Sequence, residues 1–159
     1  DRTFHDVLDL YEGPVWASHS NCRVLVDDPR QISDEQIIRL IERGAVIGGA
    51  LDAWMMVPGW RRGITTPRGA GLNLEHLLDH TDHICQLAGN ADHVGIGSDL
   101  DGGFGVEQTP QDVQSIAALQ RVGELLEERG YSTEDVDKVL HGNFIRFLRK
   151  HLPSQTPLP

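Results

Sequence analysis

The chain is poor in cysteine, has no long apolar run and carries few basic residues. Its two cysteines, Cys22 and Cys85, form no C-x-x-C pair, which favours free thiols in a reducing compartment. No run of about 18 apolar residues is present, so we expect no membrane span. Acidic residues outnumber basic ones by 24 to 14, and the net charge of −10 disfavours nucleic acid and anionic membranes as partners. We expect a cytoplasmic protein; a signal segment upstream of Asp1 is the alternative.

The length and composition suit one globular domain. The chain has 159 residues, of which 39% are hydrophobic. We place the domain at residues 1–152 and expect the proline-rich tail 153–159 to be disordered. Short apolar segments predict three buried strands, at 14–19, 45–51 and 93–98.

Apolar residues at helical spacing predict helices around these strands. Ser33 is the expected N-cap of one helix, with Gln36 as its capping-box partner. Residues 52–72 are irregular, and a loop of that length is either a functional lid or a mobile insertion. The predicted helices lie at 2–11, 33–44, 73–88 and 109–128, and a last one begins at Ser132.

Strands that alternate with helices at this spacing are typical of parallel βαβ units, and therefore of an α/β fold. Three strands cannot close a (β/α)8 barrel, which needs eight. The chain is therefore a small open sheet or the C-terminal part of a larger barrel. Because its first residues resemble a crossover helix, we favour a partial TIM barrel with about three C-terminal parallel strands, their helices and an extra C-terminal helix.

Reactive side chains follow two of the predicted strands. His19 ends the segment 14–19, and Asp99 and Asp101 follow the segment 93–98. Active sites of parallel α/β folds lie at the carboxyl ends of strands, so we expect His19 and Asp99 on one face. A neutral imidazole there is a common zinc ligand. Asp99 is a candidate for metal binding, for general base catalysis or for holding a substrate ammonium group, whereas Asp101 suits a turn.

Other polar residues are less informative in the sequence. Arg30 lies in the loop after His19, where its guanidinium could clamp a carboxylate, although a solvated arginine is the simpler interpretation. Asp52 ends the second strand in a weaker context than Asp99. Histidines at 76, 80 and 83 share one helix and resemble a metal-binding row, but that helix should lie outside the sheet, away from the strand ends.

Four segments resemble the membrane dipeptidase (renal dipeptidase) family of zinc peptidases. They occur in an order that covers nearly the whole chain, and the first and third are fairly specific together. They are PVWASHSN at 14–21, RQISDEQ at 30–36, HVGIGSDLDG at 93–102 and GNF at 142–144.

The resemblance implies a (β/α)8 barrel in which two zinc ions activate water to hydrolyse dipeptides. It implies that His19 is a zinc ligand, that Arg30 binds the substrate's C-terminal carboxylate, and that Asp99 engages its free amino group and shuttles protons. Two charged ends recognised in this way restrict the substrate to about two residues. The family's His-x-Asp pair, its bridging Glu and its other histidines have no counterpart in the chain. We therefore expect the C-terminal half of a dipeptidase, with one of five metal-ligating residues.

Two other functions stay open. The chain is then either a binding remnant without turnover or part of another metal-dependent amidohydrolase, in which Asp99 would ligate metal and Arg30 would not be required. Three strands outside a barrel leave open edges, so we expect a homo-oligomer or association with a missing N-terminal half. The remaining zinc ligands should lie upstream of this chain.

Overall fold

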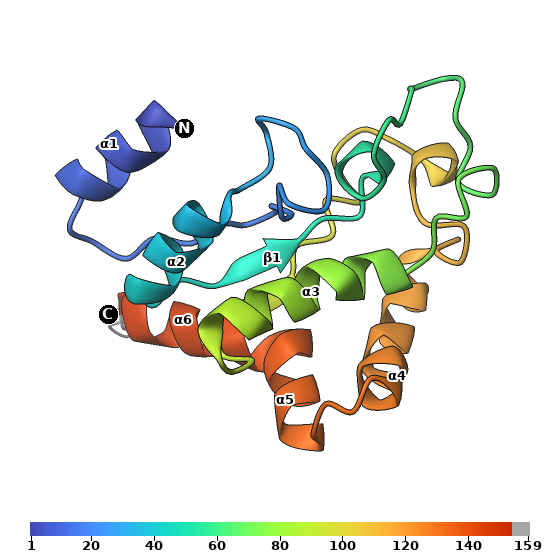
Figure 1. Ribbon diagram of the computed structural model, residues 1–159. Coiled ribbons are helices and arrows are strands. Elements are labelled where there is room, and N and C mark those ends of the chain that lie inside the picture. The colour runs from blue at the N-terminus through green and yellow to red at the C-terminus, as the bar shows by residue number, and fades with distance from the viewer. Residues whose placement is uncertain (154–159) are drawn as a thin grey trace, which may run out of the picture.

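The computed structural model describes residues 1–153 (Figure 1), so the predicted disordered tail lies, from residue 154 on, outside the described residues. Six α-helices, two strands and four short helical turns occur in this part of the chain. In chain order they are α1 (Arg2–Leu10), α2 (Asp34–Glu42), β1 (Ile47–Gly49), η1 (Ala53–Met55), α3 (Glu75–Ala88), β2 (Val94–Ile96), η2 (Val106–Gln108), η3 (Ile116–Gln120), α4 (Arg121–Glu128), α5 (Thr133–Asp137), η4 (Lys138–Gly142) and α6 (Asn143–His151).

The two strands are parallel, as predicted for 45–51 and 93–98, and they pair with Ile47 opposite Val94. Both strands are shorter than predicted. Backbone pairing nevertheless continues past their ends, because the amide of Leu51 donates to the carbonyl of Ser98 at 3.0 Å. The carboxyl ends of β1 and β2 are therefore held side by side, and they direct the segments that follow them to one edge of the sheet.

The predicted third strand at 14–19 is wrong, so the described residues hold two strands rather than three. Ala17 alone bridges to Ile47, in the parallel sense. Pro14 has no backbone donor for a ladder. Beyond Ala17 the chain turns across the sheet, and a Cβ added at Gly48 or Gly97 would collide with the carbonyl oxygen of Ser18. Regular pairing is therefore limited to one bridge, although the amide of Ser20 still donates to the carbonyl of Gly48.

Helices lie on both faces of the sheet. On one face a Cβ at Gly49 would collide with Leu77 of α3. On the other face a Cβ at Gly95 would collide with Phe144 of α6. Alternate strand residues point to opposite faces, which places α3 and α6 on opposite sides. In Figure 1, α6 passes behind α3, and both helices are drawn below β1.

Helix ends follow the sequence signals closely where caps are present. Ser33 and Gln36 form the predicted capping box at α2, and Ser132 accepts a hydrogen bond from Asp135 at the start of α5. The last predicted helix is interrupted by a π-helical turn, η4, before α6.

The predicted helix 109–128 is shorter than expected, since only α4 is α-helical. Pro110 lies in the non-helical part, and the amide of Gln111 donates to the carbonyl of Leu72 at 2.9 Å. The carboxylate of Asp112 accepts from the amide of Leu74 at 3.1 Å. These bonds connect the segment to the start of α3 in place of the bonds that a helix would make within itself.

The main hydrophobic core lies between α3 and the sheet and extends to α2, α4 and α5. It includes the buried residues Ile37, Leu40, Ile47, Leu51, Leu74, Leu77, Leu78, Ile84, Val94, Val122, Leu126 and Val136. Within residues 1–153, no helix has both the length and the apolar character needed to cross a bilayer.

Candidate functional site

His19 lies beside the carboxyl end of β1. The amide of the next residue, Ser20, donates to the carbonyl of Gly48 at 2.8 Å, which holds the His19 backbone along the strand. The imidazole is half-buried, and its Nδ1 lies 2.8 Å from the hydroxyl of Ser18. When Nδ1 carries the proton, the ring donates to Ser18 and its Nε2 is left as a lone-pair donor.

Asn21 joins the His19 segment to the end of β1, and sequence reasoning did not identify it. Its fully buried side chain accepts from the amide of Ala50 at 2.8 Å and donates to the carbonyls of Ala50 and Met55, each at 3.1 Å. An isolated asparagine in a polar stretch carries no signal for such a role. The role of Asn21 is visible only in the folded chain, where it contacts residues about 30 positions further along the sequence.

Arg30 reaches the same place from the following loop. The carboxylate of Asp28 accepts from the Arg30 amide at 2.7 Å and shapes the turn. The Nη2 of Arg30 then donates to the carbonyl of His19 at 3.0 Å. The Nη1 of Arg30 lies 3.5 Å from the hydroxyl of Ser20. The structure therefore brings the two predicted residues together, and Arg30 itself is exposed.

Asp99 follows β2 in a left-handed conformation, with φ of 58°. It is the single non-glycine residue with positive φ among residues 1–153. Aspartate tolerates this region better than most residues. The Asp99 carbonyl accepts from the amide of Gly102 at 2.8 Å, which closes a turn, while Asp101 is exposed. Because Gly97 packs against the Ser18 carbonyl, the Asp99 and His19 segments meet at one edge of the sheet.

Asp52 is better buried than any of the three predicted site residues, with 4% of its surface exposed. Its Oδ2 accepts from the indole of Trp54 at 2.7 Å and from Arg62 at 3.2 Å. Its Oδ1 accepts from the Nε2 of Gln108 at 2.6 Å. From the sequence, Asp52 was a less convincing candidate than Asp99 at the end of a strand. In the structure, its carboxylate connects the loop after β1 to the loop after β2.

The three histidines of α3 do not form a metal-binding row, because each has a different partner. His76 contacts Asn73, and His83 lies 2.7 Å from the carboxylate of Asp34. His80 is buried, and its Nδ1 accepts from the amide of Cys22 at 3.1 Å. Burial lowers the pKa of His80 to about 4, so the ring is neutral at physiological pH.

The two cysteines are free thiols, as predicted. Burial raises the pKa of Cys22 to about 12, and burial likewise raises that of Cys85 to about 11. Neither thiol is therefore ionised near neutral pH, which excludes a nucleophilic thiolate at these positions.

The residues present do not make up a metal site by themselves. A zinc site takes three or four protein ligands. Within residues 1–153, no three His, Cys, Asp or Glu side chains are grouped so that they could hold a metal ion. His19 is thus a single candidate ligand, and any metal here needs donors from another segment.

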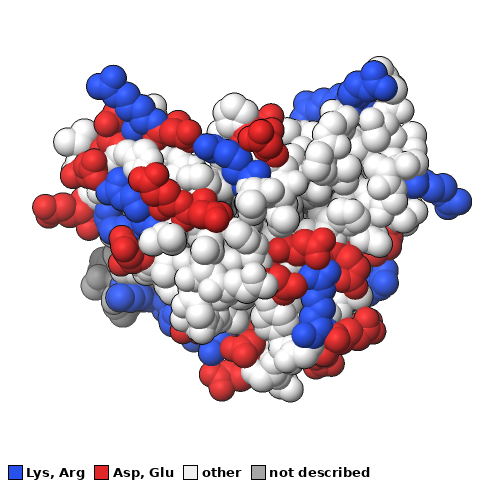
Figure 2. Space-filling view, viewed as in Figure 1, with Lys and Arg blue, Asp and Glu red and all other residues white. Residues whose placement is uncertain are grey.

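Acidic side chains outnumber basic ones on the face drawn in Figure 2. They gather over α1 and α2, at the centre right and along the lower edge, and arginine and lysine side chains lie among them as well as at the periphery. This distribution agrees with the net charge of −10. The expectation that the chain does not bind nucleic acid stays a prediction.

The sequence model that describes the membrane dipeptidases, peptidase family M19, matches residues 1–157. This chain belongs to the membrane dipeptidase family. The match confirms the relationship that the four motifs indicated.

Curated relatives in this family are distant but match almost the whole chain. A protein encoded in the pqqA 5′ region of Klebsiella pneumoniae is 30% identical, and the match covers 94% of this chain and 51% of that protein. The dipeptidase tcpJ of Claviceps purpurea is 29% identical, with 94% and 32% covered. The chain therefore spans about half or less of the length of these curated relatives.

Two solved structures are similar in fold to this chain. The crystal structure of dipeptidase AC, a metallopeptidase of family M19, superposes with a TM-score of 0.81 at 25% identity, covering 97% of this chain and 42% of that one. A Rhodobacter sphaeroides metallopeptidase, crystallised with a phosphinate mimic of the dipeptide L-Ala-D-Ala, gives 0.77 at 24% identity, with 95% and 40% covered. The chain has an α/β fold that resembles the matching part of these structures.

Proposed function

We propose that this chain is the C-terminal part of a zinc-dependent dipeptidase, built on the last strands and helices of a (β/α)8 barrel. In this proposal Arg30 binds the substrate's carboxylate, Asp99 binds its ammonium group and takes part in proton transfer, and His19 supplies one metal ligand. The observation that carries the proposal is the contact between Arg30 and the His19 carbonyl at 3.0 Å, in a chain that belongs to the dipeptidase family.

The chemistry of Arg30 suits a terminal carboxylate. Its guanidinium contacts the His19 carbonyl through Nη2 and the Ser20 hydroxyl through Nη1, while the residue as a whole is exposed, so the group is oriented and accessible to a ligand. A planar guanidinium binds a carboxylate through two parallel hydrogen bonds, which a lysine does not reproduce. A partly buried Asp99 at the same edge of the sheet supplies the opposite charge for the amino end. A dipeptide is the shortest peptide with both charges.

Replacing Arg30 by alanine should raise KM for dipeptides about 10- to 100-fold with a smaller change in kcat, because Arg30 holds the substrate before and during the reaction. The assay is hydrolysis of a dipeptide and of its C-terminal amide by the complete gene product that carries this segment. The wild type should prefer the free acid, and Arg30→Ala should lose that preference. Arg68→Ala, at an exposed loop arginine, is the control. An unchanged preference in Arg30→Ala would show that Arg30 does not bind the carboxylate.

The 159-residue chain alone should bind zinc weakly at His19, because it offers one ligand there. Complete structural sites in zinc-finger peptides bind with about 10–16 kcal/mol, and a single imidazole contributes a small part of this. Calorimetric titration with Zn²⁺ should show no tight, stoichiometric binding in either the wild type or His19→Ala. Tight, stoichiometric binding that disappears in His19→Ala would mean that further ligands are recruited, for example from a second copy of the chain.

A further inference from the structure

The segment that follows Asp99, residues 101–107, is largely exposed. Only Phe104 is half-buried within it. Glycines at 102, 103 and 105 give this segment large conformational freedom in the unfolded chain, so ordering it is entropically costly. The Asp99 backbone is itself in the left-handed region, a conformation that persists only where the surroundings determine it.

The residues on either side of this segment are nevertheless bonded to Leu51 and Asp52, which lie just beyond the end of β1. Before the segment, the carbonyl of Ser98 accepts from the amide of Leu51. After it, the side chain of Gln108, which is 8% exposed, donates to the Oδ1 of Asp52 at 2.6 Å. Leu51 and Asp52 are adjacent, so the two anchors lie next to each other at the carboxyl end of β1.

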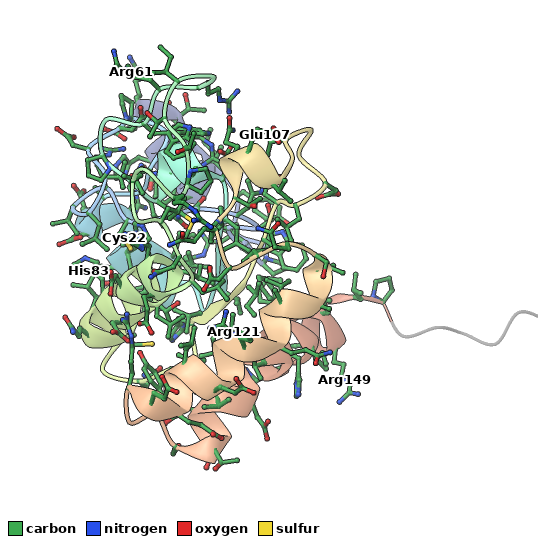
Figure 3. All side chains as sticks on the ribbon, turned by 90° about the vertical axis from the view of Figure 1, so that its right-hand side faces the viewer. Cys22, Arg61, His83, Glu107, Arg121 and Arg149 are labelled. Carbon is green, nitrogen blue, oxygen red and sulfur yellow. The ribbon has the colours of Figure 1, made fainter. Side chains whose placement is uncertain are left out.

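The other carboxylate oxygen of Asp52, Oδ2, accepts hydrogen bonds from Trp54 and Arg62 in the loop that follows β1. One buried carboxylate thus joins the loop after β1 to the loop after β2. In Figure 3, Arg61 marks the first of these loops and Glu107 the second, and both lie in the upper part of the molecule. Hydrogen bonds to a buried carboxylate are strong, because the charge is poorly solvated without them.

We propose that Asp52, through Gln108, is a positioning residue that holds the Asp99 turn in its left-handed conformation, so that the Asp99 carboxylate meets the substrate's ammonium group. The structural part concerns the turn itself and applies to this chain alone. The substrate part rests on the proposed function.

Hydrogen exchange of backbone amides tests the structural part directly. The Gly102 amide reports the Asp99 turn, and the Leu51 amide reports the sheet beside it. In Gln108→Leu, which removes only the Oδ1 contact, exchange at Gly102 should accelerate at least tenfold more than at Leu51, because the turn opens locally. Gln114→Leu, at an exposed glutamine, should change neither rate. Equal acceleration at both amides would mean general destabilisation and would overturn the proposal, as would no acceleration in Gln108→Leu.

The isosteric variant Asp52→Asn separates the hydrogen bond from the charge. Its amide can donate to a rotated Gln108 side chain while its oxygen accepts from Trp54, so protection of Gly102 should be retained. Loss of this protection in Asp52→Asn would show that the charge opposite Arg62, rather than the Gln108 bond, maintains the turn.

The substrate part is tested in the complete gene product with a dipeptide and its des-amino analogue. The wild type should prefer the dipeptide, and Gln108→Leu should reduce that preference about tenfold or more. In a protein that already carries Asp99→Asn, adding Gln108→Leu should cause no further loss of preference. A wild type that hydrolyses no dipeptide would refute the proposed function but not the exchange result. A wild type that hydrolyses dipeptides, with an unchanged preference in Gln108→Leu, would refute the positioning role alone.

Discussion

Asp99→Asn is expected to lower dipeptide turnover about 10²- to 10⁴-fold, the usual range for a positioned acid–base group. Asparagine has nearly the same shape and also tolerates the left-handed backbone at this position, so the turn to Gly102 should persist. The change therefore removes the carboxylate charge from the substrate's ammonium group without unfolding the loop. The measurement is hydrolysis by the complete gene product, with zinc content determined for each variant.

Asp101→Asn is the matched control for this prediction. Asp101 lies two residues further along the same turn and is exposed, so its loss should change turnover by less than about threefold. Near-normal turnover in Asp99→Asn would refute the role proposed for Asp99. Loss of zinc in Asp99→Asn would instead identify Asp99 as a metal ligand and favour another metal-dependent amidohydrolase.

The free energy of unfolding is expected to fall as the pH drops from 7 to 5, with His80 contributing about 2 kcal/mol. The pKa of His80 is lowered by burial from 6.5 to about 4 in the folded chain. Between these values the unfolded chain binds one proton more than the folded one. The unfolding free energy is therefore hardly affected by His80 above about pH 6.5. It falls as the pH drops from about 6.5 to about 4, and below about pH 4 protonation of His80 lowers it no further.

Urea denaturation at pH 7 and pH 5 measures this effect. His80→Asn removes the titrating group and can still accept from the Cys22 amide, because the asparagine oxygen takes the place of Nδ1. The drop in unfolding free energy should therefore be about 2 kcal/mol smaller in His80→Asn than in the wild type. His76→Asn, at a half-buried histidine of the same helix, should behave as the wild type. The same drop in all three proteins would show that His80 does not titrate in this range.

Much of the local structure could be predicted from sequence, because its signals lie within a few residues of one another. The Ser33 and Gln36 capping box is three residues long, and it marks the start of α2 correctly. The apolar segments 45–51 and 93–98 contain the two parallel strands. The motifs around His19 and Asp99 identified the family. Each of these inferences depends on neighbouring residues alone.

Errors arose where distant segments decide the local conformation. Segment 14–19 has the composition of a strand, but the crossing of Ser18 over Gly48 and Gly97 leaves a single bridge. Segment 109–128 has helical spacing, but its bonds to Leu72 and Leu74 replace the first helical turns. In both cases tertiary contacts override local preference.

Local sequence signals were enough to identify the family, the two strands, most helices and the candidate residues His19, Arg30 and Asp99. The contact of Arg30 with the His19 carbonyl, and the bond of Asp52 to Gln108, 56 residues away, could be found only in the folded chain. The difference arises from distance along the chain. Caps and periodicity arise from bonds between near neighbours, whereas a buried polar contact depends on which segments the packed core brings together.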